Sequence, residues 1–434
     1  MTASQVVVAP TSSLAEPAIT KLTPLDQIMP RFNLTMILCI PTRSNDIGRV
    51  SSLLKAGLER TITDIPYLPG RLLLDGLGRL SIKTKPRDCV LFRTQSLIDD
   101  VSWSFENLRS SGFALSKMKG ELLSPLPFFP DPEDVPVMAA QANFVDGGVL
   151  LVVCVHHAVA DVRGFSSIVE TWAKHVSGGG LEKVGLDRSL LMAQGKTVDP
   201  ANHMEYNIGG PPWAFATDVP MMAKIFRFSA AQLAKLKAEA NGEGSWVSTN
   251  DALCALLWRS ITIARAPSSE KMSTLGFAVD GRLRMDPPLP PSYIGNVNVY
   301  GTAMLPLSTL PSTALSTIAR SIRAGISRVD DARIRNVIEL IDGTEDVTMV
   351  RNRWVQFLGT DVDLTSWASI PLNGLDWGSE LGKVERVRIP DAYDYDGFCM
   401  VLPQRTDGSL EVLIGLRKDH MKRLDLCGFA DDSL

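Results

Sequence analysis

Apolar and polar residues follow two different patterns along the first half of the chain. Residues 137–145 and 149–157 are apolar runs separated by an Asp-Gly pair, which is typical of two β-strands joined by a tight turn. In residues 166–176 the apolar positions recur at helical spacing, so this segment is predicted to be an amphipathic helix. Three glycines at 178–180 are expected to end that helix.

The second half of the chain mixes the same two patterns. Residues 229–240 and 248–266 are predicted helices, and Thr249 or Asn250 is placed to cap the second of them. Residues 273–280 have the composition and alternation of a strand. Both halves therefore belong to the α/β class.

Between the halves the pattern weakens, because Gly, Pro and polar residues dominate from residue 178 to residue 224. We interpret this stretch as a long crossover. The predicted organisation is an N-terminal domain over residues 1–180, a crossover linker over residues 181–224 and a C-terminal domain over residues 225–434.

Composition narrows the choice of function. The chain has 434 residues, 45% of them hydrophobic, which is enough to bury a sizeable core. A net charge of −4 without basic runs gives no case for a nucleic-acid partner. The N-terminus lacks the features of a secretory signal, and no apolar run is long enough for a membrane span, so we expect a cytoplasmic protein without a membrane partner.

The common sequence motifs for metal, nucleotide and serine-hydrolase sites are missing. The six cysteines are scattered without a CxxC pair, and the five histidines form no HExxH pattern, so no metal site is predicted. The sequence contains no GxxxxGK phosphate loop, no strand–GxGxxG–helix unit and no GxSxG elbow.

The most informative stretch is "VCVHHAVADVRGF", which ends the second predicted strand. Successive side chains of a strand point to opposite faces, so His156 and His157 cannot both face one cleft. We expect His156 to point into the fold and His157 to lie at the strand end, where a near-neutral imidazole can act as a general base. A bare HxxxD match with Asp161 is weak evidence, and a buried histidine beside a solvated aspartate is the alternative. The sequence of strand, motif, glycine and helix favours a functional site.

The segment "HHAVADVRGFSSIVETWA" resembles the HHxxxDG…W block of the BAHD-type, coenzyme A-dependent acyltransferases. Val162 stands where many members have Gly, and Val384 where a proline is usual. The segment "LDWGSELGK" replaces the plant DFGWG signature and is closer to the fungal branch. Further segments resemble family blocks in the expected order, at residues 24–32, 120–127, 141–151, 248–259, 279–296 and 365–383.

The resemblance implies two chloramphenicol-acetyltransferase-like domains, each a mixed β-sheet with flanking helices, facing each other across a solvent channel. It implies a monomer whose co-substrate is acyl-CoA, with acetyl-CoA common in this branch, and whose acceptor is a small, hydrophobic fungal specialised metabolite. His157 is then the general base that deprotonates an acceptor hydroxyl or amine within a ternary complex.

The same resemblance assigns roles to other residues. Trp367 and Thr365 are candidates for stabilising the oxyanion, although Trp367 can equally be an ordinary buried aromatic. Asp161 is implied to pair with Arg282 and to fix the loop that carries His157. The remaining candidates are Asp376 and Gly378 for structural support, and Ser248, Thr249 and Asn296 for the donor side, where capping a helix or closing a loop is the alternative.

Two other functions remain open at this point. Condensation-type transferases share the HHxxxDG motif and the two-lobed architecture, but take acyl groups from carrier proteins. A non-catalytic binder of small apolar metabolites is the second alternative, although the intact set of His157, Asp161 and Arg282 argues against it.

Overall fold

The computed structural model describes residues 3–12, 15–44, 46–180, 182–209, 218–242, 246–267, 270–391 and 395–431. Part of the predicted linker, residues 181 and 210–217, therefore lies outside the described residues.

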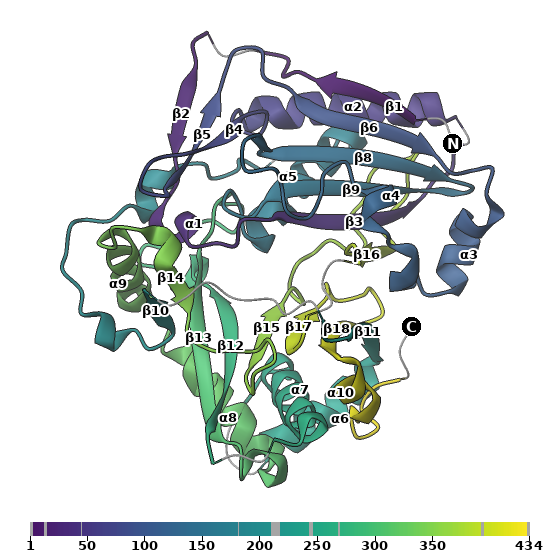
Figure 1. Cartoon of the computed structure of the whole chain (residues 1–434). Helices are drawn as coiled ribbons and strands as arrows, with labels where there is room; N and C mark the ends of the chain where they lie inside the picture. The colour runs from purple at the N-terminus through teal and green to yellow at the C-terminus, as the bar shows by residue number, and fades with distance from the viewer. Residues whose placement is uncertain are drawn as a thin grey trace.

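The first half of the chain forms an upper lobe in Figure 1. Its elements are β1 Ala3–Val8, β2 Ala18–Lys21, α1 Pro24–Gln27, β3 Asn33–Pro41, α2 Ile47–Asp64, β4 Arg71–Leu74, β5 Leu80–Thr84, β6 Val90–Ser96, α3 Phe105–Ser110, α4 Gly120–Leu123, β7 Val135–Pro136, β8 Met138–Val145, β9 Gly148–His156 and α5 Val162–Ser177.

Most of the second half forms the lower lobe. The elements of this half of the chain, of which β16 alone belongs to the upper sheet, are β10 Tyr206–Ile208, β11 Met221–Phe228, α6 Ala230–Asn241, α7 Thr249–Arg265, β12 Met272–Asp280, β13 Asn298–Pro306, α8 Leu315–Ser327, α9 Asp331–Asp342, β14 Val350–Asn352, β15 Val362–Ser366, β16 Arg386–Arg388, β17 Phe398–Val401, β18 Leu410–Arg417 and α10 Lys418–Arg423.

Each lobe is built on a six-stranded sheet. The strand order is β1-β6-β8-β9-β3-β16 in the upper lobe and β11-β18-β17-β15-β12-β13 in the lower lobe. Both sheets mix parallel and antiparallel neighbours, with β6 parallel to β8 and β15 parallel to both β12 and β17. The expected α/β fold with two mixed sheets and flanking helices is confirmed.

The central strands of the upper sheet, β3, β8 and β9, are apolar because both of their faces are covered. In the upper lobe, alternate residues of β3 and β9 enter different clusters: Leu38 and Val153 pack in the main core, whereas Ile37 and Val152 pack in a second cluster with α3. The core of the lower lobe gathers α6, α7 and α8 on one sheet face. Residues of its other face, such as Met400 and Leu413, join the main core of the upper lobe, so the two lobes share buried surface.

One strand crosses between the lobes. β16 comes from late in the chain but pairs with β3 in the upper sheet, with Val387 opposite Leu38. Arg388 on β16 is buried and its Nη1 lies 2.7 Å from Oε2 of Glu411 on β18, in the lower sheet. The predicted domain limits stay a prediction, but β16 lies in the range predicted for the C-terminal domain and packs in the other lobe.

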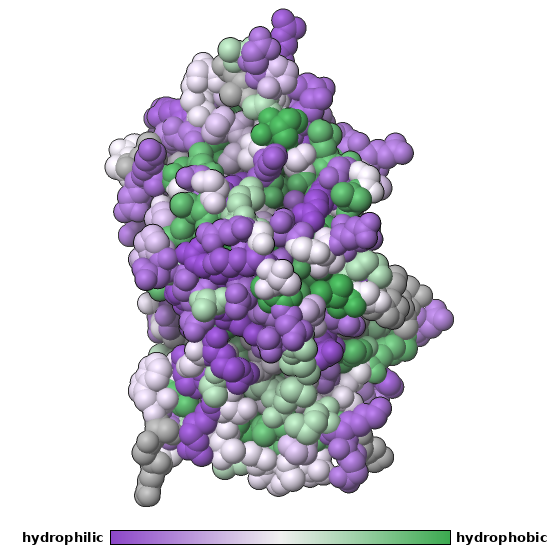
Figure 2. Space-filling view, turned by 90° about the vertical axis from the view of Figure 1, so that its left-hand side faces the viewer, coloured by the Kyte–Doolittle hydropathy of each residue, from purple (hydrophilic) through white to green (hydrophobic). Residues whose placement is uncertain are grey.

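The face of the molecule that carries β2, α9 and β10, at the left of Figure 1, is mostly hydrophilic, and its hydrophobic side chains form small separate groups (Figure 2). None of the helices that the structure describes is both long enough and apolar enough to cross a bilayer.

Candidate active site

His157 lies immediately after β9, at the turn that leads into α5. Its main-chain N–H donates to the carbonyl of Phe32 at 2.9 Å, and its ring meets the Phe32 ring edge-on with centroids 5.4 Å apart. The neighbouring His156 is 2% exposed, and its Nδ1 accepts from the N–H of Ala158 at 3.2 Å. The structure thus places His156 inside the fold and His157 at the strand end, as the alternation of strand side chains predicts.

The His157 imidazole is half-buried. Its Nδ1 is buried, without a hydrogen-bond partner among the described residues, which leaves Nε2 as the ring nitrogen in contact with solvent. Burial lowers the pKa of His157, while its own carbonyl, the charges of Asp161 and Asp26 and the side chain of Asn296 act in the opposite direction. Because the net effect is a lowered pKa, the ring is neutral at pH 7 and can accept a proton.

Asn296 binds the main chain of His157 through its side-chain amide. Its Nδ2 donates to the His157 carbonyl at 2.9 Å and to Oδ1 of Asp26 at 2.8 Å, and its main-chain N–H donates to the same Oδ1 at 2.9 Å. Asn296 is fully buried. The side chain therefore fixes the turn, and the donor-side role expected for Asn296 stays a prediction.

Asp26 and Arg188 complete this support, and sequence reasoning missed both. Asp26 is fully buried, and its Oδ2 accepts from the N–H and Oγ1 of Thr23 at 2.8 and 2.9 Å and from Nη1 of Arg188. Nη2 of Arg188 donates to the carbonyl of Val159, two residues after His157, at 2.9 Å. The Thr-x-x-Asp spacing at residues 23–26 signals a helix start, but nothing local signals the pairing with Arg188.

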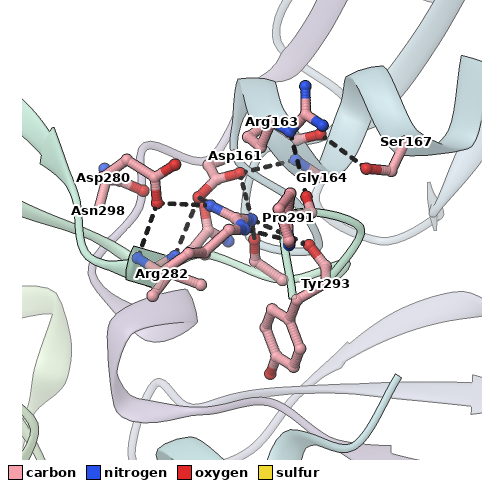
Figure 3. Close-up of polar contacts among 12 residues, drawn as sticks. Asp161, Arg163, Gly164, Ser167, Asp280, Arg282, Pro291, Tyr293 and Asn298 are labelled. Atoms are coloured by element: carbon pink, nitrogen blue, oxygen red, sulfur yellow. Dashed lines mark hydrogen bonds and ion pairs between the residues drawn. The ribbon is translucent and has the colours of Figure 1, made fainter. Parts of the chain in front are cut away.

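Asp161 is turned toward Arg282 (Figure 3). Nη1 and Nη2 of Arg282 donate to its two carboxylate oxygens at 2.9 and 2.8 Å, so the pair is bidentate. Both side chains are buried. Burial alone raises the pKa of Asp161, but the charge and hydrogen bonds of Arg282 and the N–H groups of Gly164 and Val297 outweigh that effect and lower the pKa. Asp161 is therefore an ionised structural group.

Arg282 has further partners that fix its guanidinium. Nη2 donates to the carbonyls of Tyr293 and Gly295 at 3.0 and 3.1 Å, and Nη1 donates to Oδ1 of Asp280 at 3.0 Å. The pair of Asp161 and Arg282 thereby joins the turn after β9 to the loop that precedes β13 (Figure 3).

Asp161 is also the N-cap of α5. Its Oδ1 accepts from the N–H of Gly164 at 2.8 Å. Val162 is the first helical residue, where no positive φ is required, so a valine fits in place of the family's glycine. A Cβ on Gly164 would lie 3.2 Å from the main-chain nitrogen of Gly295, so here the absence of a side chain allows the close approach.

The "LDWG" segment packs against α5 rather than near His157. The ring of Trp377 meets that of Trp172 on α5 edge-on, with centroids 5.5 Å apart. Asp376 Oδ1 accepts from the N–H of Gly378 at 2.9 Å, and Gly378 has a φ of 93° and lies against Ser177 at the end of the helix. These contacts are those of structural support.

Trp367 and Thr365 lie on one face of the lower sheet, two residues apart at the end of β15. The Trp367 side chain is 3% exposed and belongs to the main core of the upper lobe, whereas Thr365 is half-buried. Burial of Trp367 agrees with an ordinary core aromatic, and its oxyanion role stays a prediction.

Ser248 and Thr249 lie at the start of α7. Ser248 is the N-cap: its Oγ accepts from the N–H of Asp251 at 3.1 Å, and its own N–H donates to Oδ2 of Asp251 at 2.7 Å. Ser248 therefore caps the helix, which is the alternative to a donor-binding role. Thr249 is half-buried at the first helical position.

The lower sheet is open to solvent at one point of the face turned toward the upper lobe. β12 is an interior strand between β13 and β15, yet Ala278 on β12 is exposed. Tyr300, directly opposite on β13, is half-buried, as is Thr365 on β15. From Tyr300 the chain leads back to Asn296, which binds the main chain of His157. Solvent thus reaches the face of the lower sheet that is turned toward the upper lobe.

Within the described ranges, no cluster of three or more His, Cys, Asp or Glu side chains is arranged to hold a metal ion.

Comparisons with known proteins agree with this architecture. A family model described as the Transferase family matches residues 1–426. An acyltransferase of Botryotinia fuckeliana, BOA11, is 30% identical over 95% of this chain and 97% of its own. An eremophilane O-acetyltransferase of Penicillium roqueforti is 30% identical over 93% of this chain and 96% of its own.

Among solved structures, TRI101 of F. graminearum in complex with coenzyme A and deoxynivalenol superposes with a TM-score of 0.84 at 23% identity, covering 94% of this chain and 96% of its own. Vinorine synthase superposes with a TM-score of 0.74 at 20% identity, covering 99% and 98%. These two likenesses concern the fold.

Proposed function

The chain belongs to the Transferase family, and on that premise we propose that His157 is the general base in the transfer of an acyl group from coenzyme A to a small apolar acceptor. The protein is an acyltransferase that uses acyl-CoA as co-substrate, in agreement with the acyltransferase and O-acetyltransferase relatives. The predicted domain limits, a monomeric state and a cytoplasmic location are part of the same proposal. The acetyl group is the proposed acyl group, and a hydroxyl of a polycyclic terpenoid is the proposed acceptor, by analogy with the eremophilane O-acetyltransferase.

The observation that carries the proposal is the state of His157. Its Nε2 is in contact with solvent, burial keeps the ring neutral, and its main chain is held on both sides by Phe32 and Asn296. A fixed neutral imidazole can remove the acceptor's hydroxyl proton as the oxygen attacks the thioester carbonyl. The imidazolium then returns the proton to the departing thiolate of coenzyme A, so no acyl-enzyme is required.

The attack places negative charge on the former carbonyl oxygen. Trp367 and Thr365 are proposed to donate to this oxyanion, because both lie on the sheet face turned toward the upper lobe. One such donor contributes about 3–4 kcal/mol in well-studied oxyanion holes. Asp161 and Arg282 act through the position of the turn, and Asp26 and Asn296 do so from its other side.

The test is acceptor-dependent release of free coenzyme A thiol from acetyl-CoA and longer acyl-CoAs, with hydroxylated terpenoids as acceptors. His157→Ala is expected to lower kcat about 10²- to 10⁴-fold. His175→Ala is the matched control, because His175 is a histidine of α5 whose Nε2 lies 2.7 Å from Oδ2 of Asp64, away from this turn. An unchanged rate for a folded His157→Ala protein contradicts the role of His157, and no release with any donor contradicts the proposed function.

A further inference from the structure

Asp363 is an ionisable group that the proposed chemistry does not use. It lies on β15, an interior strand of the lower sheet, and its side chain is half-buried. Its Oδ1 accepts from the indole Nε1 of Trp354 at 3.2 Å, and among the described residues that indole is the only hydrogen-bond partner of the carboxyl. Oδ2 remains in contact with solvent. Burying a carboxyl costs free energy unless its oxygens accept hydrogen bonds, and here only one neutral donor is provided. The second oxygen is therefore available to a ligand.

A glycine on the strand next to Asp363 makes room for the indole of Trp354. The residue opposite Asp363 on β12 is Gly276, and a Cβ there would lie 2.1 Å from Cε2 of Trp354. The absence of a side chain at this position therefore lets the indole lie flat on the sheet beside the carboxyl. Burial raises the pKa of Asp363 to about 7, and the hydrogen bond from Trp354 opposes the shift.

Aromatic residues lie on nearby strands on either side of the carboxyl. On one side, the ring of Tyr300 meets that of Trp354 edge-on with centroids 5.1 Å apart. The ring centroids of Tyr206 and Tyr300 are 5.5 Å apart. On the other side, Phe398 is the neighbour of Asp363 on β17. An apolar skeleton can pack between such rings while one polar group reaches the carboxyl.

The position of Asp363 assigns it to the acceptor rather than to the donor. Asp363 shares its sheet face with Ala278, the exposed position at which solvent reaches the sheet. The opposite face of β15 is turned to α7, because Oγ of Ser366 donates to Oδ1 of Asn250 at 2.7 Å, and α7 begins at the donor candidates Ser248 and Thr249. Coenzyme A also carries phosphates, which a carboxylate repels.

We propose that Asp363 is a specificity-determining residue that binds a hydrogen-bond donor, a hydroxyl or a protonated amine, on an otherwise apolar acceptor. The acceptor then carries two polar groups, one that reacts at His157 and one that Oδ2 of Asp363 holds. The aromatic residues Tyr300, Trp354 and Phe398 take the skeleton between them. This inference rests on the proposed function and names the class of acceptor.

The experiment measures acetyl transfer to pairs of polycyclic terpenoid mono-alcohols and their diols, which differ in the position of the second hydroxyl, and to the matching amino alcohols. Wild type is expected to prefer one diol or amino alcohol over its mono-alcohol. Asp363→Ala is expected to raise KM for that acceptor about 10- to 100-fold, the range for a charged hydrogen bond. KM for acetyl-CoA and for the mono-alcohol is expected to change less than about threefold. Asp99→Asn, an exposed carboxyl of the other lobe, is the control.

Asp363→Asn separates the two sources of the donor group, because the amide keeps an acceptor oxygen but loses the charge. If KM for the preferred acceptor is near normal in Asp363→Asn, the group that Asp363 binds on the acceptor is a hydroxyl. If KM rises as much as in Asp363→Ala, that group is a protonated amine. Three outcomes overturn the inference while the proposed function stands. Asp363→Ala changes KM equally for the mono-alcohol and the diol, it changes KM for acetyl-CoA alone, or the wild type prefers no acceptor with a second polar group. Absence of acetyl transfer to every acceptor overturns the function, and the inference with it.

Discussion

At the scale of single residues, two effects on the pKa of His157 oppose each other: burial lowers it, and nearby carboxylates raise it. Asp161 and Asp26 are carboxyl groups near His157, and both favour the protonated ring, but desolvation disfavours it more strongly. Asp161 is already neutralised by Arg282, and Asp26 by Arg188. The two carboxylates thus fix the turn while the imidazole of His157 stays neutral at pH 7.

The pH dependence of the reaction follows from this balance. In the proposed mechanism the unprotonated form of His157 is the active one. Its pKa is lowered from the usual 6.5, so activity is expected to persist as the pH falls below 6.5. The measurement is the acidic limb of the profile of kcat/KM against pH, which reports the free enzyme. An acidic limb with a midpoint at or above 6.5 contradicts a burial-dominated His157.

Asn296→Asp gives a related prediction at this scale. The change places a carboxyl beside Asp26 in a fully buried position, where two acidic groups repel each other and one of them must be protonated. We expect kcat to fall with KM for acetyl-CoA little changed, because the turn moves but the donor side does not. An increase in KM for acetyl-CoA with unchanged kcat favours instead the donor-side role first expected for Asn296.

Residue patterns predicted some of these roles and not others. The period of two along a strand is enough to separate His156 from His157, because it depends only on adjacent residues. Asp26, Arg188 and Asn296 come from three distant segments, and each pattern around them signals only a helix start or a loop. Their convergence is a property of tertiary packing.

At the scale of elements, the start of α5 is the critical junction. Asp161 caps the helix and binds Arg282, so one carboxylate joins the turn of His157, the helix and the loop before β13. Trp377 supports the same helix through Trp172. A change at any of these contacts acts on the imidazole through its turn.

Asp161→Ala is expected to lower the free energy of unfolding by about 3–5 kcal/mol, because it leaves the buried charge of Arg282 uncompensated. Asp46→Ala is the matched control, since Asp46 also caps a helix, α2, but is exposed, and a cap alone contributes about 1 kcal/mol. Urea titrations of the two variants measure the difference. Equal losses contradict a stabilising ion pair at Asp161.

The elements themselves were largely predictable. The strands expected at 137–145 and 149–157 are observed as β8 and β9, because their apolar runs and Asp-Gly turn are local signals. The predicted cap of α7 was wrong: Ser248 caps the helix instead of Thr249 or Asn250. The Ser-x-x-Asp spacing of a capping box was present in the sequence and identifies the serine.

At the scale of the whole molecule, β16 and the buried pair of Arg388 and Glu411 join the lobes. The pairing of β16 with β3 could not be predicted, because a three-residue strand has too short a pattern and its partner is in the other half of the chain. The α/β character of both halves, in contrast, is a sum of local patterns and was predicted.

Arg388→Ala is expected to lower the free energy of unfolding by about 3–5 kcal/mol, because it leaves Glu411 buried without this partner. Arg109→Ala, which removes the more exposed pair with Glu385, is expected to cost less than about 1 kcal/mol. Calorimetry is expected to show one transition for both lobes in each variant. Separate transitions in the wild type contradict a molecule joined through β16.

The late position of β16 bears on how the chain folds during synthesis. Until residue 388 has left the ribosome, β3 has an open edge along Ile37–Cys39, where main-chain groups lack their final partners. The upper sheet is therefore completed only after most of the lower lobe has been made, and we expect its open edge to favour edge-to-edge aggregation in the meantime. A nascent chain that stalls between the lobes carries an intact histidine motif on an unfinished sheet, and we expect such a chain to bind chaperones.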